Sequence, residues 1–351
     1  MNMPLTIEAE ITPGMSPQEV THLATLVEEV GFDRLGISDV PSYPDCFQLQ
    51  ALCALATKRI MIGSLVTNPY SHHPVLLASA IATLQEVSNG RAFLGLGAGA
   101  GLEDIGIAQP RPVAALREAM GIIRDLLAGR LVERLGQVYT IRKAKLVRVP
   151  EQAVPIMIGT RSPQTMRLAG EHADIAVIGA RYWSPAIVQR YRQWLAEGTT
   201  RAGRRMDDIE VAPRLTLCVS QDGELAKRSV KFYAAYYLTL LKPNDLALAP
   251  THLARIEAAV QQARGWYFDA DVQYPEELHE LISDDIVARF AIAGTPSECV
   301  QQVKRILDLG FTSLSMNLAA VRHGSMYDGL KETITTFGAV LPEVRRLAAA
   351  V

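Results

Sequence analysis

The chain has 351 residues, of which 49% are hydrophobic and 21% are charged, and this composition is typical of a globular protein that buries a large core. A net charge of −2, with both signs mixed along the chain, argues against a nucleic-acid-binding protein. No apolar run reaches the ~18 residues of a membrane span, and residues 1–11 lack the pattern of a signal peptide, so we expect a cytoplasmic protein with no membrane partner.

Strand-like apolar segments alternate with amphipathic helical patterns in the first half of the chain. The predicted strands are 5–11, 34–38, 60–66 and 91–97, and the predicted helices are 16–30, 46–57, 75–88 and 113–128. In the helix 16–30, Val20, Leu23 and Val27 share one face, and Gly31 ends it. Residues 131–147 alternate in polarity and predict an inserted hairpin with its turn near Gly136.

The same alternation continues in the second half. The predicted strands are 154–159, 174–179, 209–220 and 311–318, and the predicted helices are 163–170, 184–197, one from Glu224 into the 230s, 294–310 and a long C-terminal helix. Residues 240–290 are less regular, and we interpret them as an excursion that covers one mouth of the fold. Its aromatic residues Trp266, Tyr267 and Phe268 are expected to pack in the core rather than contact a substrate.

Eight strand–helix pairs are the number that a parallel barrel requires. The strands are continuous apolar runs, as expected when both faces of a sheet are covered. The sequence therefore predicts an α/β fold, a single (β/α)₈ TIM barrel over residues 1–351, with insertions near 131–147 and 240–290.

Polar and small residues gather just after the predicted strands, where barrel enzymes place their active sites. Asp39 follows the second strand, the segment TNPYSHHP (67–74) follows the third, and GAGAG (97–101) follows the fourth with Glu103 close behind. GTRSP (159–163) follows the fifth strand. These strand ends are the candidate site.

The two loops rich in glycine or hydroxyl residues each allow two interpretations. GLGAGAG (95–101) either makes room for backbone turns or leaves main chain bare for a planar ring, and it is a weak match to a dinucleotide-binding motif because Ala100 replaces the last glycine. Thr160, Arg161 and Ser162 precede a helix that starts with Pro163, so they form either a simple helix cap or a phosphate site.

Ionisable residues at the strand ends are equally open to a structural role. His72 and His73 point in opposite directions in extended chain, so only one can face a pocket, and no third ligand with suitable spacing supports a metal site. Asp39 is either a turn residue or a catalytic carboxylate. The four cysteines lack a CxxC pair, and Cys46 and Cys53 are interpreted as buried thiols.

Residues 60–101, with the block TNPY…HP, resemble the deazaflavin-dependent methylenetetrahydromethanopterin reductases and their bacterial relatives in the bacterial-luciferase-like superfamily. The resemblance extends through 154–179 and 294–317 and covers most of the barrel, whereas 240–290 matches poorly. It implies a flavin or deazaflavin cofactor, either coenzyme F420 or FMN, and a homodimer.

The resemblance also implies roles for individual residues. A non-proline cis peptide between Ser64 and Leu65 would support the middle ring of the cofactor, with Thr67 and Asn68 near the ring edge. Three residues, Gly97, Ala98 and Gly99, would border the ring, and four, Gly159, Thr160, Arg161 and Ser162, would hold the phosphate. Asp39 would lie near the reactive carbon.

Three positions depart from the pattern of the relatives. Ala100 occupies the place of an acidic proton donor, so Glu103 or Asp104 would have to replace it. Val40 stands where relatives often have histidine, and His72 stands where the reductases usually have arginine. These differences weaken the case for the pterin substrate and for deazaflavin over FMN.

The resemblance favours an oxidoreductase that transfers hydride to or from a small organic substrate, with Asp39, His73 and Glu103 as the candidate catalytic residues. An FMN-dependent monooxygenase is the first alternative, and a flavin-binding barrel without turnover is the second. A hydrolase or aldolase would need a metal cluster or a buried lysine at a strand end, and neither is apparent.

Overall fold

We analysed a computed structural model, which describes residues 5–243, 246, 248–269 and 271–349. The strands are β1 Thr6–Ile11, β2 Arg34–Ile37, β3 Met61–Thr67, β4 Ala92–Leu96, β5 Val132–Leu135, β6 Thr140–Ala144, β7 Ile156–Thr160, β8 Ile175–Ile178, β9 Glu210–Val219, β10 Ile292–Gly294 and β11 Ser313–Leu318. Two short 3₁₀ helices, Glu103–Ile105 and Met206–Asp208, lie in loops.

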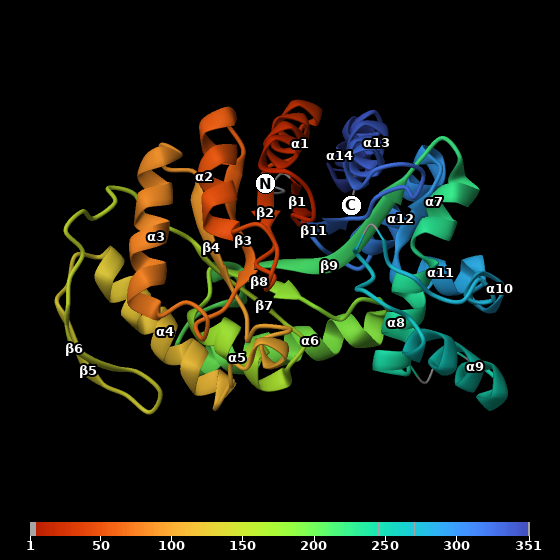
Figure 1. Cartoon of the computed structure of the whole chain (residues 1–351). Coiled ribbons are helices and arrows are strands. Elements are labelled where there is room, and N and C mark those ends of the chain that lie inside the picture. Colours follow the sequence, from red (N-terminus) through yellow and green to blue (C-terminus); the bar gives the residue numbers. More distant parts are fainter. Residues whose placement is uncertain (1–4, 244–245, 247, 270, 350–351) are drawn as a thin grey trace.

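The α-helices surround the strands (Figure 1). They are α1 Pro17–Val30, α2 Cys46–Ala56, α3 Pro74–Val87, α4 Pro112–Leu127, α5 Pro163–His172, α6 Pro185–Arg201, α7 Gly223–Ser229, α8 Lys231–Leu241, α9 Pro250–Gln261, α10 Leu278–Leu281, α11 Asp284–Phe290, α12 Pro296–Leu307, α13 Met326–Gly338 and α14 Leu341–Ala349.

Eight parallel strands of the described chain close into a barrel in the order β1, β2, β3, β4, β7, β8, β9, β11. β11 pairs with β1, with Glu8 opposite Ser315, and this pairing completes the ring. β10 adds a short parallel pairing at the end of β9. The predicted TIM barrel and its eight strands are therefore confirmed.

The predicted hairpin insertion is confirmed as the antiparallel pair β5–β6. Two helix predictions are wrong in detail. The helix expected after Glu224 is divided into α7 and α8, and the single long C-terminal helix is two helices, α13 and α14. Gly338 ends α13 against Val30 of α1, where a Cβ atom on Gly338 would lie 2.5 Å from the Val30 Cβ.

The side chains of β1 show how the barrel divides its two faces. Ile7, Ala9 and Ile11 are fully buried in the main hydrophobic cluster that also contains the inner faces of α1 and α2. Glu8 and Glu10 alternate with them and point into the barrel interior, which follows from the two-residue period of a strand.

The barrel interior is apolar on one side and charged on the other. Side chains of β3, β4, β7, β8 and β9 form a separate apolar cluster, which consists of Leu65, Phe93, Met157, Ile175, Val177 and Ala212. On the opposite side, Arg34 Nε lies 3.1 Å from Glu8 Oε2, and Arg34 Nη1 donates to Glu210 Oε2 at 2.9 Å. Burial raises the pKa of Glu8, although the Arg34 guanidinium opposes this shift.

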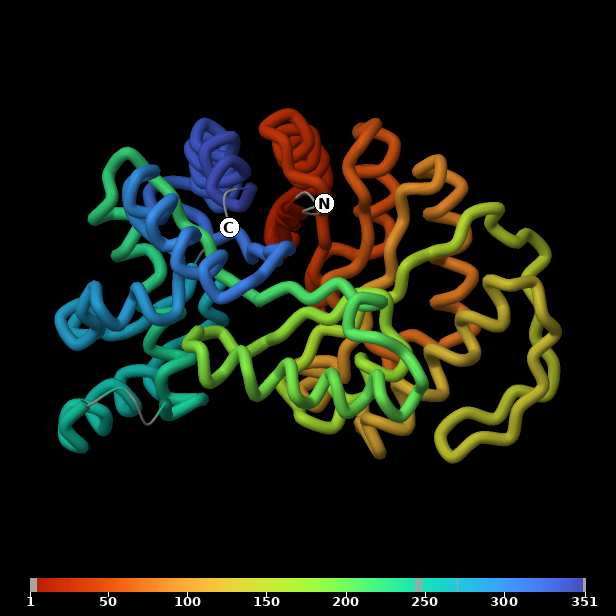
Figure 2. Tube along the Cα trace, turned by 180° about the vertical axis from the view of Figure 1, so that it is seen from behind, coloured from red at the N-terminus to blue at the C-terminus, as the bar shows by residue number. Residues whose placement is uncertain are grey.

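The predicted excursion packs around a second hydrophobic cluster, separate from the main one, that joins α8 to α9, α10 and α11. These helices and the β5–β6 hairpin lie on opposite sides of the barrel, as both views show (Figure 2). Residues 244, 245, 247 and 270 of the excursion lie outside the described residues. Among the described helices, none has both the length and the apolar character needed to cross a bilayer.

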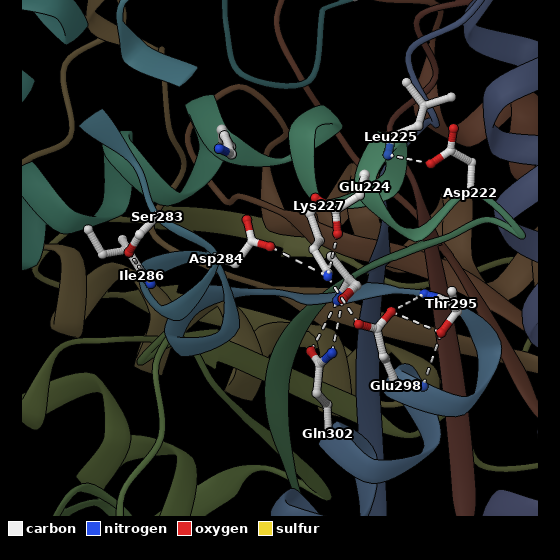
Figure 3. Close-up of polar contacts among 12 residues, drawn as sticks. Asp222, Glu224, Leu225, Lys227, Ser283, Asp284, Ile286, Thr295, Glu298 and Gln302 are labelled. Atoms are coloured by element: carbon white, nitrogen blue, oxygen red, sulfur yellow. Dashed lines mark hydrogen bonds and ion pairs between the residues drawn. The ribbon is translucent and has the colours of Figure 1, made fainter. Parts of the chain in front are cut away.

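A polar network fastens this side of the molecule to the barrel (Figure 3). Lys227 Nζ in α7 lies 2.9 Å from Glu224, 3.0 Å from Glu298 and 3.4 Å from Asp284, so one ammonium group joins α7, α11 and α12. Thr295 caps α12 in a capping box with Glu298.

Candidate functional site

A cavity of about 820 Å³ opens at the carboxyl ends of the barrel strands. Residues from every one of the eight barrel strands or the loops that follow them contribute to its wall. They include Glu10, Thr12, Ser38, Asp39, Leu65, Val66, Gly97 to Gly101, Glu103, Gly159 to Ser162, Gly179, Arg181, Arg214 and Asn317, and Tyr236, Tyr237, Leu240, Trp266, Tyr267 and Phe268 also line the cavity. The predicted site residues from four separate strand ends thus meet in one cavity.

β3 bulges into this cavity. The register of β3 against β4 shifts between Ser64 and Thr67, and the peptide bond between Leu65 and Val66 is cis. The sequence prediction placed the cis bond one residue too early, between Ser64 and Leu65. Leu65 and Val66 line the cavity, whereas the buried Ser64 hydroxyl donates to the Gly95 carbonyl at 2.9 Å and holds the two strands together.

Glycines of the neighbouring strands make room for the bulge. A Cβ atom on Gly97 would lie 2.7 Å from Val66 Cγ2, and one on Gly159 would lie 3.0 Å from Val66 Cγ1. The distance at Gly97 is too short for a Cβ atom, and the one at Gly159 would require Val66 to shift slightly. Gly97 of the glycine loop and Gly159 of the next strand therefore make room for the Val66 side chain, and both leave bare main chain on the cavity wall.

The glycine loop that follows β4 accepts hydrogen bonds from Gln109 and packs against the ring of Trp266. Gln109 Nε2 donates to the carbonyls of Ala98 and Gly99, the latter at 3.2 Å. Gly99 and Gly101 both have positive φ, which glycine adopts without strain. A Cβ atom on Gly101 would lie 3.3 Å from the ring of Trp266. Loop and ring thus bound one end of the cavity.

The segment after β7 forms the start of α5. Ser162 is the N-cap of α5 and accepts a hydrogen bond from the Thr165 amide at 3.4 Å, while Thr160 Oγ1 accepts one from the Ser162 amide at 3.0 Å. Pro163 occupies the first turn, and Arg161 is exposed beside it. We call Thr160, Arg161 and Ser162 the anion cradle, because the positive end of a helix and a guanidinium meet there.

Asp39 lies at the cavity wall in contact with two residues of the TNPYSHHP segment. Thr67 Oγ1 donates to Asp39 Oδ2 at 2.6 Å, and His72 Nε2 lies 3.2 Å from the same oxygen. The hydrogen bond to Asp39 raises the pKa of His72, against the opposing effect of partial burial. The orientation of the Asp39 carboxylate is therefore fixed by two contacts to one oxygen.

His73 occupies a different position from the one expected for a catalytic residue. Its Nδ1 accepts a hydrogen bond from the Val75 amide as the N-cap of α3, and its ring packs edge-on against Tyr139 of the hairpin. His73 does not line the cavity. The sequence analysis named His73 as a candidate catalytic residue, but it is His72 that contacts Asp39.

The other predicted residues fall into two groups. Ala98, Gly99 and Glu103 line the cavity, and Glu103 is exposed at its rim. Thr67 and Asn68 are buried behind the wall, where the side-chain oxygen Oδ1 of Asn68 accepts hydrogen bonds from the backbone amides of Tyr70 and Ser71 at 2.9 Å. Asn68 therefore shapes the turn that presents His72.

The floor of the cavity carries a buried ion pair that the sequence analysis did not identify. Arg214 of β9 pairs with Glu10 of β1, and both side chains are less than a tenth exposed. Glu10 also accepts hydrogen bonds from Ser38 and, at 3.1 Å, from Asn317 Nδ2. The alternation of polar residues in β1 and of Arg214 with Thr216 in β9 was the available signal, since inward-facing charges are unusual in a barrel strand.

We call α8 together with residues 266–269 the cover. Tyr43 donates a hydrogen bond to Asp269, and Arg322 donates to the carbonyls of Tyr267 at 2.9 Å and Asp269 at 3.1 Å, so the cover is tied to the barrel from two sides. Trp266, Tyr267 and Phe268 line the cavity. The expectation that these three residues only pack in the core was wrong.

Comparison with known proteins agrees with this arrangement. The chain is 29% identical to the 5,10-methylenetetrahydromethanopterin reductase of Archaeoglobus fulgidus, over 87% of this chain and 91% of that protein. It is also 29% identical to the F420-dependent glucose-6-phosphate dehydrogenase of Nakamurella multipartita, over 94% of both chains.

The fold matches the structure of the coenzyme F420-dependent tetrahydromethanopterin reductase from Methanopyrus kandleri, with a TM-score of 0.81, 23% identity and coverage of 97% of this chain and 100% of that one. Residues 2–313 match the family described as luciferase-like monooxygenase. The chain therefore belongs to the luciferase-like monooxygenase family.

Proposed function

We propose that this protein is an oxidoreductase that binds a deazaflavin, coenzyme F420, and uses it to transfer hydride to or from a small organic substrate. One observation carries the proposal. The bulge at Leu65–Val66, the bare backbone of Gly97 to Gly99 and the anion cradle at Thr160 to Ser162 all border a single cavity. Of the two relatives compared by sequence, the glucose-6-phosphate dehydrogenase of Nakamurella multipartita is named as F420-dependent, and this supports deazaflavin over FMN.

The residues of the cavity fit such a cofactor. A flat tricyclic ring needs a stretch of cavity wall without side chains. Gly97 and Gly99 after β4 and Gly159 in β7 provide such a stretch. A phosphate needs hydrogen-bond donors and a positive charge, which the hydroxyls of Thr160 and Ser162, the positive end of α5 and Arg161 provide. When bound, the deazaflavin supplies hydride transfer at its ring.

The chain's own residues position the partners of the reaction and handle protons. Asp39 faces the cavity, and Thr67 and His72 fix its carboxylate by two contacts to the same oxygen. In this proposal Asp39 exchanges a proton with the substrate, and His72 is a positioning residue. Glu103 lies at the rim of the cavity, near Ala100, which stands where relatives have an acidic residue. In this proposal Glu103 takes over that role and exchanges protons with solvent.

Water exclusion is assigned to the cover. Trp266 lies against Gly101, and Tyr236, Tyr237 and Tyr267 close the side of the cavity opposite the bulge. An enclosed site strengthens the electrostatic interactions within it and protects a reduced cofactor from side reactions. Two further parts of the proposal follow the family: the protein acts in the cytoplasm, and it forms a homodimer.

Binding and oxygen consumption test the cofactor assignment. The apoprotein is titrated with F420 and, separately, with FMN, and cofactor fluorescence gives each dissociation constant. We expect F420 to bind at least about tenfold more tightly, which corresponds to ~1.4 kcal/mol. Tight FMN binding accompanied by oxygen uptake after reduction would overturn the deazaflavin assignment, and incorporation of oxygen into a substrate would then identify the monooxygenase alternative. Binding of a cofactor that exchanges no hydride with any donor would establish a barrel without turnover.

A further inference from the structure

Arg181, directly after β8, lines the same cavity but was not among the predicted site residues. Its backbone has a φ of 68°, a conformation that L-residues other than Asn and Asp seldom adopt. Its guanidinium carbon lies 4.9 Å from the centre of the Tyr237 ring. The backbone turn and the ring together hold the guanidinium at the cavity wall.

The charge of Arg181 has no carboxylate partner among the described residues, and its Nε is buried without a hydrogen-bond partner there. The other two arginines of the cavity differ. Arg214 is paired with Glu10, and Arg161 is exposed to solvent at the anion cradle. Arg181 as a whole is half-buried, but its buried Nε is costly to leave without a partner, because burial removes the water that would otherwise solvate it. A ligand anion would remove that cost.

Two neutral polar groups near Arg181 also lack a hydrogen-bond partner among the described residues. Tyr233 Oη and Thr216 Oγ1 are both buried, with no hydrogen-bond partner in the described part of the chain. They line a small neighbouring pocket together with Tyr267, and the Tyr233 ring lies 4.8 Å from the ring of Tyr237. Tyr237 and Tyr267 line the cavity beside Arg181, and their hydroxyl oxygens lie 3.0 Å apart. Hydroxyl and guanidinium donors together are suited to a carboxylate or phosphate.

We propose that Arg181, with the hydroxyls of Tyr237 and Tyr267, binds a carboxylate or phosphate group of the substrate. The proposal rests on the proposed function above, and it narrows the substrate to an organic anion. This group of residues, which we call the second anion subsite, is distinct from the anion cradle that would hold the cofactor phosphate.

The surroundings of Arg214 support a separate subsite. Burial lowers the pKa of Arg214, and the phenol groups of Tyr233, Tyr237 and Tyr267 are among the groups that oppose this shift. The same three tyrosines surround Arg181. Arg181, Tyr237 and Tyr267 line the same cavity as Glu10 and Arg214, so the second anion subsite and the Glu10–Arg214 floor face one space. Arg161 instead packs beside Gly179, where a Cβ atom would lie 3.0 Å from Arg161 Cγ.

The test uses protein saturated with F420, so that the anion cradle is filled, and the probes are inorganic phosphate and benzoate. Calorimetric titration should detect one probe anion bound per chain. Arg181→Met should weaken its binding at least about tenfold, as expected for loss of a charged hydrogen bond. Arg181→Lys should restore part of the affinity. Arg190→Met, on an exposed position of α6, is the matched control and should bind the probe like the wild-type protein.

The source of the anion is separated by a second titration. Coenzyme F420 carries a phosphate, and its phosphate-free deazaflavin core does not. If Arg181→Met weakens binding of F420 but not of the phosphate-free core, Arg181 serves the cofactor and the proposal is overturned. Absence of probe binding to the saturated wild-type protein overturns it as well. Absence of F420 binding to wild-type protein is a failure of the proposed function instead, and thermal melts of each variant verify folding.

Discussion

His72 Nε2 lies 3.2 Å from Asp39 Oδ2, and Thr67 Oγ1 lies 2.6 Å from the same oxygen. The two donors come from the two sides of the turn that Asn68 shapes after β3, and Asp39 comes from the end of β2. This contact ties the orientation of one carboxylate to the protonation of one imidazole.

Substitution of Asp39 tests its role in proton exchange. Asp39→Asn keeps the shape and the contact with Thr67 but cannot accept a proton, so kcat should fall by a factor of about 10² to 10⁴, while F420 affinity changes little. Steady-state kinetics with a substrate found by screening organic anions would measure this. Equal kcat values for Asp39→Asn and wild-type protein would exclude Asp39 as the proton donor or acceptor.

The His72–Asp39 contact predicts a pH dependence of stability. Contact with Asp39 raises the pKa of His72 in the folded chain, so the charged pair stabilises the fold fully below about pH 6.5, the ordinary value for histidine. That contribution is lost as the pH rises through the higher folded pKa. Urea titrations of wild-type protein and His72→Gln should therefore differ most at acidic pH and converge at alkaline pH. A difference that does not vary with pH would contradict the pair.

Gly97 is predicted to be required for the bulge of β3. Gly97→Ala places a Cβ atom 2.7 Å from Val66 Cγ2 and should destabilise the fold by about 1–3 kcal/mol, in addition to weakening F420 binding. Gly14→Ala is the matched control, because its new Cβ atom would meet only the edge of the Tyr43 ring at 3.4 Å, an ordinary contact. Chemical unfolding and fluorescence titration measure the two effects. Normal stability of Gly97→Ala would show that the bulge adjusts freely.

Removal of one member of the Glu10–Arg214 pair should be more harmful than removal of both. Arg214→Gln leaves a buried carboxylate without its cation and should cost about 3–5 kcal/mol of unfolding free energy. Glu10→Gln combined with Arg214→Gln leaves no uncompensated charge, so the double variant should be more stable than Arg214→Gln. Additive losses in a double-mutant cycle would mean that the two side chains do not interact.

The network around Lys227 should affect stability without affecting chemistry, because none of its residues lines the cavity. Lys227→Met leaves three carboxylates facing one another and should lower the unfolding free energy by about 1–2 kcal/mol, between the values of exposed and buried pairs. Lys304→Met, which breaks only the exposed pair with Asp308, is the control and should change little. Thermal melts and F420 titrations separate stability from binding.

Most of the fold followed from periodicity in the sequence. The strands of the barrel are continuous apolar runs between helices with clear caps, such as Ser162 before Pro163, and local pattern alone locates them. The division into α7 and α8 and into α13 and α14 was missed because both breaks lie inside segments with helical composition. Such breaks depend on tertiary contacts, as Gly338 against Val30 illustrates.

The site was predictable where backbone type matters and less so where side-chain direction matters. Glycines and the helix cap identified the wall and the anion cradle. The cis bond was misplaced by one residue, since adjacent residues of a run such as SLVT look alike, and His72 could not be told from His73 because neighbours in extended chain differ only in direction. Arg181 and Tyr237 are far apart in sequence, so their contact appears only in the folded chain.

The cover and the barrel have separate hydrophobic clusters, and this has a consequence for substitutions in either one. Mutations that repack α8 to α11 do not remove apolar contacts from beneath the helices that surround the strands. A substitution that repacks this cluster can therefore reshape one side of the cavity, while the strand ends that would hold the cofactor keep their own packing.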